Sequence, residues 1–107
     1  MSNLEEIKKD IIDEVDRLQP ELLKVSKYIF DNPELAFHEE KASKLLSEKL
    51  AENGFDTVLG IGGLPTAFSA EYQLGEGGPV ICIAAEYDAL PELGHACGHN
   101  LIASSAY

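Results

Sequence analysis

The side chains best suited to chemistry lie close together in one short stretch of the chain. They are two carboxylates, one thiol and two imidazoles, namely Glu86, Asp88, His95, Cys97 and His99. Thiolate and imidazole are the ligands that zinc and neighbouring transition metals prefer. Gly98 separates Cys97 from His99, and it permits a tight backbone turn that aims both side chains at one point. The cluster predicts a metal site, whereas a single buried cysteine or a single surface histidine is usually structural.

Glu86 and Asp88 follow a strongly apolar segment, which we interpret as a strand that ends beside them. Alternate residues of a strand face the same way, so both carboxylates can project into one crevice. Ligand sites in open α/β sheets gather at the carboxyl ends of strands. For the two carboxylates taken alone, a solvated strand end is the alternative interpretation. Asn100, directly after the cluster, is a candidate cap for the helix that comes next.

Two helices are predicted before the cluster. Ser2 and Glu5 have the spacing of a capping box, and apolar residues then recur with helical periodicity. Pro20 lacks a backbone donor and crowds the preceding turn, so we expect this helix to break or kink there before the periodicity resumes. The second helix is expected to begin at residues 38–40. It should end near Gly54, since glycine tolerates the left-handed conformation.

Strands are expected after these helices. Residues 55–59 and 66–72 have the composition of strands, and the second of them alternates as a half-buried strand should. Residues 80–85 are continuously apolar, which is typical of a central strand covered on both faces. A third helix is expected from about Asn100. The predicted fold class is therefore α/β, with N-terminal helices packed on a partial mixed sheet.

The distribution of charge excludes one class of partner. The chain of 107 residues has a net charge of −11, and all eight of its Lys and Arg residues lie between Lys8 and Lys49. Nucleic-acid binding is not expected, because it requires a cationic surface. The acidic field suits the capture of cations, and simple solubility is the alternative interpretation.

Segment composition also predicts the compartment. No stretch approaches the roughly 20 apolar residues that span a bilayer, so no membrane association is expected. The N-terminus is acidic and polar, without the features of a signal peptide. The two cysteines, Cys82 and Cys97, are too few for a disulfide framework. We therefore expect free thiols and a cytoplasmic location.

Two parts of the chain resemble a known enzyme family. They are Asn32-Pro33-Glu34-Leu35 with the later Glu39, and residues 85–100, which read AEYDALPELGHACGHN. Both are similar, in this order, to the start of the M-twenty metallopeptidases, the group of aminoacylases, carboxypeptidases and amidohydrolases. The branch that they resemble most contains p-aminobenzoyl-glutamate hydrolase subunits and aminoacylase-like dipeptidases.

The resemblance implies a hydrolase of amide bonds in N-acyl amino acids or small peptides, with a site for two divalent metals, zinc or manganese. It makes Cys97 and His99 metal ligands, and it places Asp88 beside the site as the catalytic candidate that orients them. Glu86 stands where other branches have a histidine ligand or an aspartate. Asn100 stands where many members have an aspartate, so no ligand role is assigned to it. Contacts to the ligands or to the substrate are expected for three residues: Glu86, His95 and Asn100.

The resemblance also implies that residues 1–107 are the N-terminal portion of a larger, zinc-peptidase-like catalytic domain. Members of the family run to several hundred residues, and their general-base glutamate and remaining ligands lie further along the chain. We therefore expect this chain alone to be inactive, and its apolar strand edges to favour a homo-oligomer. The alternative is a non-catalytic, self-associating domain that binds metal without turnover.

Overall fold

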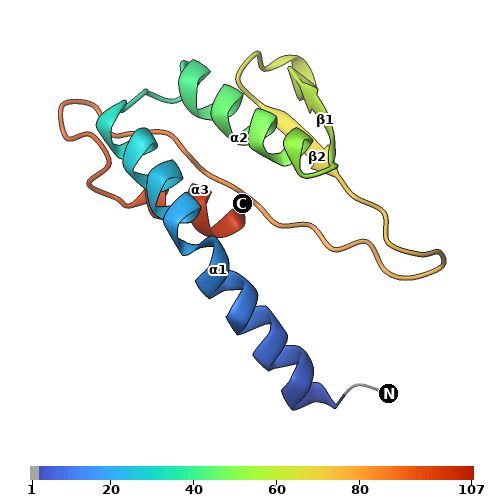
Figure 1. Cartoon of the computed structure of the whole chain (residues 1–107). Coiled ribbons are helices and arrows are strands. Elements are labelled where there is room, and N and C mark those ends of the chain that lie inside the picture. Colours follow the sequence, from blue (N-terminus) through green and yellow to red (C-terminus); the bar gives the residue numbers. More distant parts are fainter. Residues whose placement is uncertain (1–2) are drawn as a thin grey trace.

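A computed structural model describes residues 3–107 of the chain. In chain order its elements are α1 (Leu4–Asp31), α2 (Glu40–Glu52), β1 (Asp56–Leu59), the short 3-10 helix η1 (Ile61–Gly63), β2 (Phe68–Glu71) and α3 (His99–Ala106). Helix α2 lies against the hairpin of β1 and β2, and α3 lies against α1 (Figure 1). Within this range the combination of helices and a sheet confirms the predicted α/β class.

Helix α1 begins with a capping box. The backbone N–H of Glu5 donates to the Asn3 side chain at 3.2 Å, and the N–H of Asn3 donates to the Glu6 carboxylate at 3.2 Å. The box expected at Ser2 lies outside the described residues. The N-terminal half of α1 projects beyond the rest of the molecule (Figure 1). Neither α1 nor any other helix in residues 3–107 combines the length and the apolarity needed to cross a bilayer.

Pro20 lies inside α1 and does not end it, so the predicted break is wrong, while the kink that was its alternative stays a prediction. Contacts with α3 explain the continuity. The Oγ of Ser104 donates to the carbonyl of Leu22 at 2.8 Å, and the side chain of Asn100 donates to the Oγ of Ser26 at 3.1 Å. These bonds fix the half of α1 that comes after the proline, and tertiary packing of this kind offsets the helix donor that proline removes.

The sheet is a hairpin of two antiparallel strands, in which Asp56 pairs with Glu71 and Leu59 pairs with Phe68. The prediction of a mixed sheet is therefore wrong for residues 3–107. The core lies between the helices, because each of them buries its apolar face there. It consists of Val25, Ile29, Ala42, Leu46 and Ala103.

Residues 80–85, predicted to be a central strand, form no strand within the described range. A strand needs a neighbouring strand for its backbone groups, and β1 and β2 hydrogen-bond only to each other. The segment instead continues past the helices as an irregular connection (Figure 1). Val80 is 97% exposed and Ile81 is 81% exposed. Apolar side chains are thus left uncovered on the residues that lead to Glu86.

Candidate functional site

The loop between α1 and α2 holds the segment that carries Asp88. The backbone N–H of Ala89 donates to the carbonyl of Glu34 at 2.7 Å, and Leu35 forms an isolated parallel bridge with Ala89. The Glu34 carboxylate accepts from the N–H groups of Lys41 and Ala42, both at 2.9 Å. A carboxylate at these free donors stabilises the start of α2. Glu34 therefore joins α2 to the backbone beside Asp88.

His99, the first residue of α3, lies between the two carboxylates. Its Nδ1 is 2.7 Å from Oδ1 of Asp88 and 3.1 Å from the Asp88 carbonyl. Its Nε2 is 3.2 Å from Oε2 of Glu86. The structure thus brings Glu86, Asp88 and His99 together, but the carboxylates contact opposite nitrogens of one imidazole. A carboxylate on one ring nitrogen is the usual partner of a histidine that binds metal through the other.

The expected turn before α3 is present. Gly98 has φ 87° and ψ 19°, in the left-handed region that favours glycine, and it is the N-cap of α3. Cys97, just before it, carries an exposed free thiol, as does Cys82. Within residues 3–107, no three side chains of His, Cys, Asp or Glu gather closely enough to hold a metal ion. The ligand roles of Cys97 and His99 therefore stay predictions.

His95 is buried, with only 6% of its surface exposed. Neither of its ring nitrogens has a hydrogen-bond partner in the described part of the chain. Burial lowers the pKa of His95, and the positive charge that the nearby His99 can carry lowers it further. The contact of His95 with the ligands or the substrate stays a prediction.

Asn100 has a structural position that differs from the prediction. It lies inside α3, whose N-cap is Gly98, so the expected capping role is wrong. A cap precedes the first helical residue, and the left-handed turn at Gly98 moves that position two residues upstream of Asn100. Its side chain is buried and donates to Ser26 of α1. The bond links α3, which begins with His99, to the longest helix.

A second polar cluster, which was not predicted from the sequence, lies behind the segment of Glu86 and Asp88. The hydroxyl of Tyr87 donates to the carbonyl of Thr66 at 2.5 Å, and the Thr66 hydroxyl donates to the buried Glu39 carboxylate at 2.6 Å. Burial, together with the nearby Glu39 charge, raises the pKa of Tyr87 to about 12. Strand alternation was the available signal, since it turns residue 87 away from its neighbours and into the protein.

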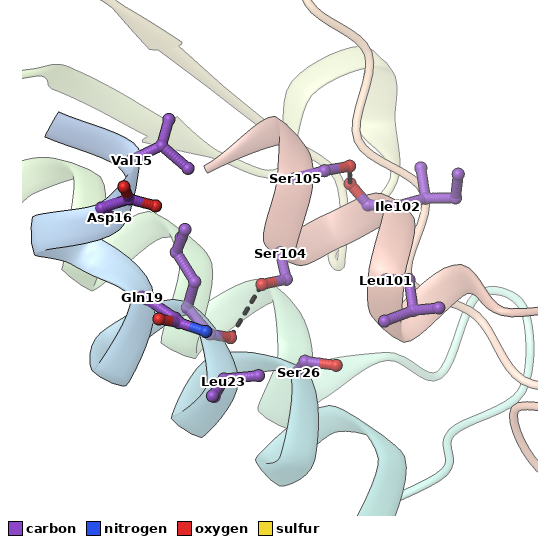
Figure 2. A pocket seen from close by; sticks show the side chains of 10 residues that line it. Val15, Asp16, Gln19, Leu23, Ser26, Leu101, Ile102, Ser104 and Ser105 are labelled. Atoms are coloured by element: carbon purple, nitrogen blue, oxygen red, sulfur yellow. Dashed lines mark hydrogen bonds between the residues drawn. The ribbon is translucent and has the colours of Figure 1, made fainter. Parts of the chain in front are cut away.

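An apolar groove lies elsewhere, between α1 and α3. It has a volume of about 490 Å³, and apolar side chains such as Val15, Leu23 and Ile102 line it together with Ser104. Figure 2 shows Ser104 pointing at α1 across the groove, while the Ser105 hydroxyl bonds within α3. None of the groove's lining residues belongs to the candidate site. The groove is therefore not where the sequence places the chemistry.

Comparison with known proteins identifies the family. The chain is 31% identical over 121 residues to a p-aminobenzoyl-glutamate hydrolase subunit of Escherichia coli (strain K12), an alignment that covers 97% of this chain and 25% of that protein. It is 40% identical over 110 residues to the Xaa-Arg dipeptidase of Mus musculus, covering 95% of this chain and 26% of that protein. The chain belongs to the M-twenty metallopeptidase and amidohydrolase family.

A further M-twenty relative has a third kind of activity in its name. The chain is 32% identical over 98 residues to the N-acetylcysteine deacetylase of Bacillus subtilis (strain 168), covering 78% of this chain and 26% of that protein. No family model matches the chain. The chain spans about a quarter of the length of the M-twenty relatives that it matches. The family resemblance drawn from the two sequence motifs is thereby confirmed.

Proposed function

We propose that the chain supplies metal-holding residues to a hydrolase of amide bonds in N-acyl amino acids or small peptides. The observation that carries the proposal is the contact of His99 with Asp88. Both carboxylates beside the ring can only accept, and Asp88 is the nearer of the two at 2.7 Å against 3.2 Å for Glu86, so in this proposal a ring with one proton carries it on Nδ1. Nε2 is then left with its lone pair, facing the Glu86 carboxylate. A cation between these two atoms satisfies both of them.

The chemistry of the donors favours a metal ion as that cation. Imidazole, carboxylate and the exposed thiol of Cys97 suit zinc, and carboxylate-rich sites also accept manganese. In this proposal His99 and Cys97 hold the metal, while Asp88 keeps the proton on Nδ1 and fixes the ring. Such a metal, when bound, polarises a carbonyl and generates hydroxide at neutral pH. Free thiols at Cys82 and Cys97 suit a reducing compartment such as the cytoplasm.

The names of the relatives support the substrate class. They include a p-aminobenzoyl-glutamate hydrolase, a hippurate hydrolase, an N-acetylcysteine deacetylase and a dipeptidase. Each of these names refers to an amino acid whose nitrogen is joined through an amide. Since residues 3–107 do not gather three metal ligands, we propose that this chain alone holds metal without turnover.

Cobalt substitution tests the ligand set. A cobalt–thiolate bond gives a charge-transfer absorption that free cobalt lacks. We expect this absorption in the wild type and in Cys82→Ser, which removes the other exposed thiol, and its loss in Cys97→Ser. Equal absorption in both variants, or none in the wild type, contradicts the proposal. Release of the free amino acid from N-acetyl amino acids by this chain contradicts the proposed lack of turnover, and release that continues in the presence of a chelator contradicts the metal dependence.

A second candidate function is self-association, and the exposed segment at residues 80–85 favours it. This segment is uncharged and apolar, with Ile83 72% exposed. We propose the same segment of a second copy as its occupant. Antiparallel pairing separates the two Glu86 carboxylates, which in-register parallel pairing would place side by side. Light scattering tests this: a dimer that Ile81→Lys converts to monomer supports it, and a monomeric wild type at tens of micromolar contradicts it.

A further inference from the structure

Tyr87 stands between the two carboxylates that contact His99, yet it faces the other way. Its hydroxyl donates to the carbonyl of Thr66 at 2.5 Å. Its ring stacks on that of Phe68, with centroids 6.0 Å apart and planes 24° from parallel. Both contacts lie on residues that lead into or form β2. Tyr87 therefore fastens the segment of Glu86 and Asp88 to the hairpin.

The hydroxyl of Tyr87 bonds to a carbonyl that is itself held in place. The Thr66 hydroxyl donates to the Glu39 carboxylate at 2.6 Å, and both residues are buried. Glu39 is the N-cap residue of α2, which packs on the same hairpin. Glu39, Thr66 and Tyr87 thus connect three separate parts of the chain. A hydrogen bond of this kind is worth most where its acceptor is already fixed and shielded from water.

Within the described range, no backbone–backbone hydrogen bond holds residues 80–88. Residues 80–85 form no strand, so no ladder of hydrogen bonds sets the position of Glu86 and Tyr87. The next fixed point is Ala89, whose N–H donates to the Glu34 carbonyl at 2.7 Å. Asp88 therefore lies between two anchors, Tyr87 on one side and Ala89 on the other. Removing either anchor frees the backbone from which the Asp88 side chain reaches His99.

We infer that Tyr87 is a positioning residue of this site, whose hydroxyl sets the contact between Asp88 and His99. It touches neither of them, and it acts through the backbone that it holds. The inference gives the proposed function a further residue and rests on that proposal for its biological meaning. The geometric claim itself concerns only groups of this chain, so it can be tested without metal or substrate.

The test is nitrogen-15 NMR of His99 in the metal-free chain, for the wild type, Tyr87→Phe and Tyr72→Phe. Tyr72→Phe is the matched control, because it removes the same hydroxyl from a ring that is exposed and packs on Phe55. We expect His99 to hold its proton on Nδ1 in the wild type and in the control. In Tyr87→Phe we expect exchange of that proton to be roughly fivefold faster, the factor that one ordinary hydrogen bond supplies.

Two further variants complete the test. The Asp88→Asn variant gives the NMR spectrum of His99 when the neighbouring carboxylate is missing. The His99 signals of Tyr87→Phe should shift toward that spectrum. Thr66→Val keeps the carbonyl that Tyr87 uses but removes the bond to Glu39, so it should shift less in the same direction. A purely structural role would lower stability in urea and leave the His99 signals of the folded state unchanged. Unchanged His99 signals in Tyr87→Phe overturn the inference, and so does a wild-type His99 spectrum in Asp88→Asn. Failure of the wild-type chain to retain metal bears only on the proposed function.

Discussion

Asp88 and His99 are eleven residues apart in sequence and 2.7 Å apart in space, through Oδ1 and Nδ1. The contact joins the end of an irregular segment to the first residue of α3. Both partners are anchored, because Ala89 is hydrogen-bonded to Glu34 and α3 is hydrogen-bonded to α1. The imidazole is therefore held by its surroundings before any ligand arrives, and that preorganisation is the feature from which the proposed site follows.

Replacement of Asp88 by asparagine should weaken zinc binding. Loss of a carboxylate that orients a metal-binding histidine typically costs 10- to 100-fold in metal affinity, and a loss of about that size is expected here. Competition against a chromophoric chelator measures it. Asp56→Asn, on the exposed edge of β1, makes the same change of charge away from the site and should leave the affinity unaltered. Equal affinities for the two variants would show that Asp88 has no orienting role.

Replacement of Ser104 by alanine should destabilise the junction of α1 and α3. The Ser104 hydroxyl is buried and donates to the Leu22 carbonyl, so its removal should lower the free energy of unfolding by about 1 kcal/mol. Ser105→Ala makes the same substitution one residue later, on an exposed hydroxyl that bonds within α3. It should change the free energy of unfolding by less than about 0.5 kcal/mol. Urea unfolding of both variants distinguishes them, and the reverse order would refute the account of this junction.

Stability at high pH should depend on Tyr87. The pKa of Tyr87 rises from 10.0 to about 12 on folding, so between these values the unfolded chain loses a proton that the folded chain keeps. Its stabilising contribution is complete below pH 10 and is lost as the pH rises toward 12. Urea midpoints measured from pH 9 to pH 11.5 should therefore fall more steeply for the wild type than for Tyr87→Phe. Parallel curves would mean that the Tyr87 hydroxyl is not buried.

Replacement of Pro20 by alanine should stabilise α1. Proline is less favourable than alanine inside a helix by about 3 kcal/mol, and the helix already continues through this position. The free energy of unfolding should rise by about 1–3 kcal/mol. Gln19→Ala, at the neighbouring exposed position, serves as the control, since glutamine and alanine have similar helix propensities. A destabilised Pro20→Ala variant would indicate that the proline makes contacts that alanine cannot replace.

Local patterns predicted the elements better than their pairing. Periodicity and Gly54 located α2, and composition located β1 and β2, because these signals arise within a few residues. The strand predicted at residues 80–85 was wrong for the opposite reason, because an apolar run does not reveal whether a neighbouring strand is present. The helix break predicted at Pro20 was wrong because contacts with α3, which is distant in sequence, decide whether the helix continues.

The candidate site was predictable to a similar extent. Residue types and spacing grouped Asp88 with His99, the family resemblance placed Asp88 beside this histidine, and the structure shows the two in contact. The two carboxylates contact opposite nitrogens of the imidazole. This arrangement depends on the position of α3 relative to the preceding segment, which no local pattern specifies. The cluster of Glu39, Thr66 and Tyr87 joins residues 21 and 27 positions apart, and it was missed for the same reason.

The central claim is that His99 presents a metal-binding nitrogen, and zinc content per chain tests it most directly. Zinc would be measured after incubation and desalting for the wild type, for His99→Ala and for His38→Ala, which replaces an exposed histidine outside the site. The account predicts near-stoichiometric zinc in the wild type and in His38→Ala, and a loss of at least about tenfold in His99→Ala. Absence of zinc from the wild type, or equal retention by both variants, would contradict it.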